Sequence, residues 1–77
     1  MRTFDDLQGR QWQAALMEAS FGSVVLVFGR LGGSEVVQKT LDAEAANITA
    51  AEALLANLDD AGLRALLAEA VPWSHDD

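Results

Sequence analysis

The chain changes character near Asp42, and this change constrains its fold more than any other feature of the sequence. Before Asp42, Val, Phe and Gly are frequent, and four basic side chains balance four acidic ones. From Asp42 onward, Ala and Leu dominate, and Arg64 is the single basic residue against eight acidic ones. The net charge of -7 therefore lies in the second part of the chain. Such a switch indicates a change from strand to helix, and it predicts an α+β fold.

We predict a single domain over residues 1–77, with a β-sheet half (1–41), a helical half (42–73) and a polar tail (74–77). A chain this short buries only about 60–65% of the surface that its unfolded form exposes, so its stability is limited. Domains of this size often gain stability from disulfides, a metal ion or self-association. The sequence contains no cysteine and one histidine. We therefore expect no metal and no cofactor, and self-association remains as the source of added stability.

Four segments of the first half have the composition of strands. Val24–Phe28 is the clearest, because it is β-branched and aromatic and is bounded by glycine. Arg2–Asp5 and Ser34–Leu41 fit shorter strands. Gln11–Ala19 alternates as a strand does, although its Ala, Met, Gln and Glu content suits a helix equally well. The short connections favour an antiparallel β-meander of three or four strands.

Two short α-helices are predicted in the second half, packed on one face of the sheet. Thr49 and Glu52 have the spacing of a capping box, which places the first N-cap at Thr49. Asp59 is the predicted N-cap of the second helix. Pro72 ends that helix, because the residue before a proline is pushed out of the α region. Ala43–Asn47 fits either a loop or an extra helical turn.

The predicted sheet is apolar on both faces, whereas two short helices can cover one. Along the central strand, Val25 and Val27 point away from Leu26 and its alternate neighbours. Ala15 and Met17 lie in the same manner on the strand before it. We therefore take Ala15, Met17, Val25 and Val27 as a candidate interface. An exposed apolar face is unusual in a monomer, and a second copy of the chain is the simplest partner, which predicts a homodimer.

The sequence offers no convincing reactive site. Ser74, His75 and Asp76 are the residue types of a hydrolase triad, but three consecutive residues at a chain end do not converge through two hydrogen bonds. Asp59 and Asp60 are better explained by a helix start, where the helix dipole favours negative charge. We expect no catalytic residues and no enzymatic activity.

Charge and hydropathy narrow the range of partners. With five basic residues against twelve acidic ones and a pI of about 4.3, the chain is a poor ligand for nucleic acid. Its longest uncharged apolar run, Val24–Phe28, is far shorter than the roughly 20 residues that cross a bilayer. The first residues do not form a signal peptide, and the lack of cysteine fits a reducing compartment. We expect a cytoplasmic protein without membrane contact.

The start of the chain has the pattern Phe4-x-Asp6-x-x-Gly9-Arg10-x-Trp12. This stretch resembles the opening of some short uncharacterised bacterial proteins, in which it reads as a β-hairpin. The resemblance covers residues 2–12 and rests on turn-forming residues and one aromatic side chain. It implies a hairpin in this chain and no particular activity.

These features favour a small non-catalytic protein-interaction or accessory module that self-associates. Two alternatives stay open. One is an acidic, charge-based regulator that covers a basic partner, and strong salt dependence of binding would identify it. The other is a subunit of an enzyme, which would carry a deep pocket with converging polar groups.

Overall fold

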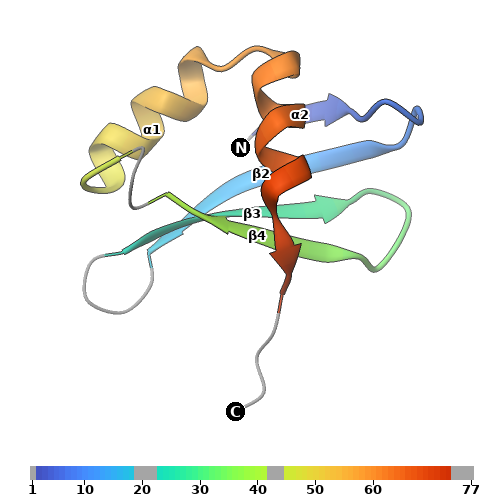
Figure 1. Cartoon of the computed structure of the whole chain (residues 1–77), viewed down its shortest axis with the longest axis horizontal. Helices are drawn as coiled ribbons and strands as arrows, with labels where there is room; N and C mark the ends of the chain where they lie inside the picture. Colours follow the sequence, from blue (N-terminus) through green and yellow to red (C-terminus); the bar gives the residue numbers. More distant parts are fainter. Residues whose placement is uncertain (1, 19–22, 42–44, 74–77) are drawn as a thin grey trace.

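The protein is described by a computed structural model that covers residues 2–18, 23–41 and 45–73. Five antiparallel strands form one sheet in the order β1-β2-β3-β4-β5, and two helices separate the fourth strand from the fifth. The α+β fold is confirmed (Figure 1). The elements are β1 (Arg2–Asp5), β2 (Gln11–Glu18), β3 (Val24–Arg30), β4 (Val36–Thr40), α1 (Ile48–Asn57), α2 (Asp60–Glu69) and β5 (Val71–Pro72).

The β1–β2 hairpin is built around the carboxylate of Asp6. Its Oδ1 accepts the backbone N–H groups of Gln8 (2.9 Å) and Arg10 (2.8 Å). Its Oδ2 accepts the indole N–H of Trp12 (2.8 Å) and the Nε of Arg10 (3.2 Å). Gly9 takes a φ of 83° at the turn, a conformation that glycine adopts without a Cβ clash. The Asp, Gly, Arg and Trp residues of the pattern at the chain start therefore stabilise a β-hairpin.

The segment from Gln11 to Glu18 is a strand, so the strand interpretation is confirmed over a helix. It pairs with β1 on one side and with β3 on the other. Two sets of ladder hydrogen bonds outweigh the helix propensity of Ala, Met and Gln, because propensity is a weak preference beside tertiary pairing. Ala19, the predicted end of the strand, lies outside the described residues.

The helices begin at different caps from those that the sequence suggests. The prediction that Thr49 caps α1 is wrong. The N-cap is Asn47, whose side-chain oxygen accepts the N–H of Ala50 at 2.8 Å, two residues earlier than expected. Asn and Thr are both good N-caps, and the structure uses the earlier one. Asp59 caps α2 as predicted, since its Oδ1 accepts the N–H of Gly62 at 2.8 Å.

A fifth strand follows α2, which is one more than the predicted three or four. The second helix ends at Glu69, ahead of Pro72, as expected. The chain then turns back to the sheet, where Val71 pairs with Gln38 and Pro72 with Val37. Proline is tolerated there because β5 is an edge strand and needs no further N–H donor.

Both helices pack on the same face of the sheet (Figure 1). That face presents Phe4, Trp12, Ala14, Leu26 and Phe28, and all five are at least 95% buried. The rings of Phe4 and Phe28 meet edge to face, with their centroids 5.9 Å apart and their planes at 75°. The helices contribute a smaller set of buried side chains to the same cluster, namely Ala51, Leu55 and Leu63.

Polar side chains at the rim of the sheet hold the helices in place. Arg2 donates from Nη1 to the carbonyl oxygens of Leu55 and Leu58, both at 2.8 Å, at the C-terminal end of α1. The Nε of Arg64 donates to the carbonyl of Asp5 at 2.7 Å and so joins α2 to β1. These long-range bonds fix the sheet face that the helices cover, and the opposite face carries the candidate site.

Candidate functional site

The sheet has a second face, turned away from the helices, which we call the open face. Successive side chains of a strand point to opposite sides, so residues that alternate with the core residues share this face. The strand pairings align them in rows across β2 to β5. The rows are Gln13–Gly29–Val36, Ala15–Val27–Gln38–Val71 and Met17–Val25–Thr40.

All four predicted interface residues lie on the open face, and the structure brings them together. Ala15 pairs directly with Val27, and Met17 pairs with Val25. None of these side chains belongs to the core cluster or to the partly buried hydrophobics packed against it. The open face therefore carries these four apolar side chains, with the polar side chains of Gln13, Gln38 and Thr40 among them.

The four side chains differ in how much surface they offer. Met17 is 39% exposed, Ala15 and Val27 are half-buried, and Val25 is only 6% exposed. A partner would therefore gain more from Met17 than from Val25, since the free energy of burial follows the apolar area removed from water.

Two exposed valines extend the open face beyond the predicted set. Val36, in β4, is 40% exposed, and Val71, in β5, is 56% exposed. The sequence signal for Val36 was present, because it lies in a predicted strand. Val71 was missed because the proline after it was interpreted as the end of a helix and not as part of a strand.

Charge is distributed unevenly between the two sides of the sheet. The described strands contain five charged residues, and four of them point to the same face as the core residues, namely Arg2, Glu18, Arg30 and Lys39. Three of these join ion pairs, Arg2 with Asp60 at 3.8 Å, Arg30 with Glu35 at 2.7 Å and Lys39 with Glu69 at 3.5 Å. Asp5, on the edge strand β1, alternates toward the open side. Over the described strands β2, β3 and β4 the open face is free of charged side chains.

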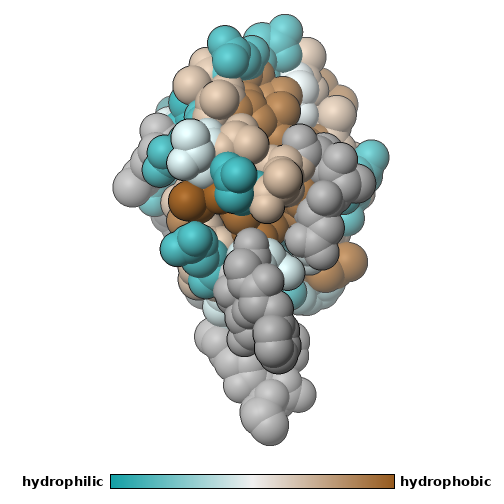
Figure 2. Space-filling view, turned by 90° about the vertical axis from the view of Figure 1, so that its left-hand side faces the viewer, coloured by the Kyte–Doolittle hydropathy of each residue, from teal (hydrophilic) through white to brown (hydrophobic). Residues whose placement is uncertain are grey.

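Hydrophobic residues also reach the surface elsewhere. The side of the molecule on which α1 begins and β2 ends shows them gathered between hydrophilic ones (Figure 2). Leu7, at the tip of the β1–β2 turn, is 85% exposed. An isolated exposed leucine is ordinary on a protein surface and marks no site by itself.

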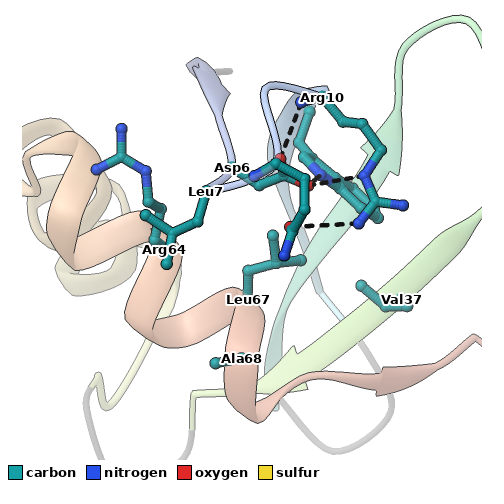
Figure 3. A pocket seen from close by; sticks show the side chains of 9 residues that line it. Asp6, Leu7, Arg10, Val37, Arg64, Leu67 and Ala68 are labelled. Carbon is teal, nitrogen blue, oxygen red and sulfur yellow. Dashed lines mark hydrogen bonds and ion pairs between the residues drawn. The ribbon is translucent and has the colours of Figure 1, made fainter.

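A hollow of about 370 Å³ lies between the β1–β2 turn, α2 and β4 (Figure 3). Its floor is apolar, formed in part by Trp12, Val37 and Leu67, and Asp6 and Arg10 line its polar side. These polar groups are already engaged with one another. The hydrogen bond from the Trp12 indole lowers the pKa of Asp6 from its ordinary value of 3.8, and the bonds from Arg10 and Gln8 act in the same direction. Such a carboxylate is a poor general base at neutral pH, and its role is structural.

The other residues considered as reactive groups either have a structural role or lie outside the described residues. Asp59 is a helix cap, and the Oδ1 of Asp60 lies 3.8 Å from Nη2 of Arg2. The Ser74-His75-Asp76 sequence falls outside the residues that the structure describes. Within those residues, no three His, Cys, Asp or Glu side chains gather as a metal site would require. No helix among them has the length and apolarity needed to cross a membrane.

Comparison of the chain with models of known families, with curated proteins and with solved structures yields no match.

Proposed function

We propose that the protein is a small non-catalytic interaction module that self-associates through its open face, in the simplest case as a homodimer. One observation carries the proposal. The described strands β2 to β4 turn apolar and uncharged side chains to the open face and send their charged residues to the other side. Depletion of charge with retention of apolar area is the composition of an interface centre.

The charge of the chain favours a second copy as the occupant. Two chains that each carry -7 repel one another wherever their acidic surfaces meet. A face without charge over its three central strands is where two identical chains can approach at the least electrostatic cost. A two-fold symmetric contact places this face against itself, so each copy covers the apolar side chains of the other.

The size of the face sets the expected strength. Five strands at a spacing of about 4.8 Å, with about five residues each at about 3.3 Å, give a footprint of about 24 by 17 Å. This planar area of about 400 Å² is half of the roughly 800 Å² per partner in a standard stable interface. We therefore expect reversible association, with a dissociation constant in the micromolar range.

Sedimentation velocity or light scattering over a series of concentrations tests the proposal. We expect the average mass to rise from one chain toward two through the micromolar range, with little dependence on salt. Met17→Glu places a charge on the open face and is expected to keep the chain monomeric. Leu7→Glu is the matched control, because it makes the same kind of change at an exposed site away from that face.

Two results would contradict this function. A wild-type chain that stays monomeric at high micromolar concentration excludes self-association. Equal weakening by Met17→Glu and Leu7→Glu would show that the open face is not the contact. Binding to a basic protein that is lost as salt increases would instead support the charge-based regulator.

A further inference from the structure

Of the described glycines, all but one have a positive φ or a neighbouring atom where a Cβ would lie. Five glycines lie in the described part, and two of these, Gly9 and Gly32, have positive φ angles of 83° and 82°. That conformation disfavours any residue with a Cβ. A Cβ at Gly33 would meet the guanidinium of Arg30, the far end of a flexible side chain, which would have to move aside. At Gly9 and Gly32 the backbone itself favours glycine, and at Gly33 a neighbouring side chain occupies the space.

The same holds for Gly62, near the start of α2. A Cβ there would come within 2.7 Å of Cδ2 of Leu58 and within 3.3 Å of Oδ1 of Asp59. Asp59 is the N-cap of α2, and its Oδ1 accepts the Gly62 N–H. The absence of a side chain at Gly62 thus keeps this capping contact undisturbed.

Gly29 is the exception. It lies inside β3, paired with Gln13 on one side and Val36 on the other, and its backbone is not in the positive-φ region. Apart from Gly29 and its two chain neighbours, no atom of the described chain lies within 4 Å of a Cβ built there. Glycine weakens a strand interior, and it often marks a place where another molecule approaches closely. Gly29 therefore leaves open space above the sheet, here called the Gly29 notch, which no side chain of the described residues fills.

We propose that the Gly29 notch receives the Met17 side chain of a second copy, so that two such contacts form in each homodimer. This inference rests on the proposed self-association. Met17 is the longest exposed apolar side chain on the open face, and its unbranched thioether adapts to irregular gaps. The partner's methionine fills the space that Gly29 leaves.

The geometry of the sheet permits this exchange and excludes its intramolecular form. Met17 pairs with Val25, which is four residues from Gly29 along β3, a distance of about 13 Å at about 3.3 Å per residue. The methionine of the same chain thus lies too far away to fill its own notch. The Ala15–Val27 pair lies midway between the Met17–Val25 row and the Gln13–Gly29 row. A two-fold axis that lies in the plane of the contact and passes between Ala15 and Val27 can therefore bring each Met17 over the partner's Gly29.

The dissociation constant of the homodimer, measured by sedimentation, tests the contact. Gly29→Val fills the notch with a residue that strands favour, so the folded chain is expected to be as stable as wild type or more so. Its dimer should nevertheless be weaker by about tenfold, since the partner's methionine no longer fits. Met17→Ala should weaken the dimer by a similar factor. Thr3→Val, on the edge strand of the open side, is the control and should change the dissociation constant less than twofold.

The double variant Met17→Ala/Gly29→Val identifies the pair. Residues this far apart within one chain should have independent effects, which would multiply to about a hundredfold. If the two residues meet across the dimer, valine at position 29 has no methionine to displace once Met17 is alanine. The dissociation constant of the double variant should then stay near ten times that of the wild type.

The possible failures are distinguishable. A monomeric wild-type chain overturns the proposed function and this inference with it. A wild-type dimer whose dissociation constant is unchanged by Gly29→Val overturns the notch alone. Multiplicative effects in the double variant show that Gly29 and Met17 do not meet, which also overturns the inference.

Discussion

Replacing Arg2 by methionine tests whether one side chain of the sheet holds the first helix. The Nη1 of Arg2 donates to the carbonyls of Leu55 and Leu58, which belong to the last turn and C-cap of α1. The last carbonyls of a helix have no partner within it, and a cation there also opposes the negative end of the helix dipole. Methionine keeps the length of the stem and loses both interactions.

The magnitude follows from the exposure of the site. A hydrogen bond from a charged donor contributes about 1.5–3 kcal/mol. The two bonds share one nitrogen, and the Arg2 side chain is 29% exposed, so water replaces part of what is lost. The ion pair with Asp60 spans 3.8 Å to a side chain that is 54% exposed, and it adds little. We expect Arg2→Met to lower the free energy of unfolding by about 2 kcal/mol, which lowers Tm by about 8–16 °C in a domain of this size.

Urea unfolding followed by circular dichroism measures this loss at one fixed protein concentration. The midpoint should fall while the slope with denaturant stays the same, because the surface exposed on unfolding does not change. Asp60→Asn is the control, and it should cost less than about 1 kcal/mol. A loss below about 0.5 kcal/mol for Arg2→Met would refute the reasoning, since that is the ordinary effect of a neutral surface substitution.

Three further predictions follow from the fold. Asn47→Ala should cost about 1 kcal/mol of stability and Thr49→Ala less than half of that, because Asn47 is the N-cap; the reverse order in urea melts would restore the capping box at Thr49. Leu63→Ala should cost about 2–5 kcal/mol, because this fully buried leucine joins α2 to the core, and a melt like that of wild type would contradict that packing. Asp6→Asn should destabilise the chain at neutral pH. Because the pKa of Asp6 is lower in the folded chain than its ordinary 3.8, this contribution is complete above about pH 5 and disappears as the pH falls below 3.8 through the folded-state pKa. Melts of both proteins should therefore converge in acid, and a difference that widens there would show the opposite sign.

The sequence predicted well those turns and helix caps that depend on neighbouring residues. The Gly9 turn and the Asp59 cap depend on residues that are neighbours in the chain, so composition and spacing were sufficient. The alternation of Val25 and Val27 with Leu26 likewise follows from strand geometry alone. The apolar residues that β2 and β3 turn away from the core could therefore be predicted from the order of the residues alone.

Choices between equal local preferences needed the tertiary structure. Asn47 and Thr49 are both acceptable caps, and the hydrogen bond that decides between them is seen only in the folded chain. The short strand at Val71 forms because β4 offers it an unpaired edge, which no local pattern reveals. The same holds for the sheet face that the helices cover and for the empty space above Gly29.

By itself, the sequence determined the fold class, the approximate positions of β1, β3, β4 and both helices, and the presence of four apolar residues that alternate away from the core. The tertiary structure decided which face the helices cover, through the contacts of Arg2 and Arg64 with distant backbone carbonyls. It also decided that Val36 and Val71 join the open face and that the space above Gly29 is empty of the described chain. The physical reason is that patterning is a property of one segment, whereas register, coverage and empty space arise when segments distant in sequence meet.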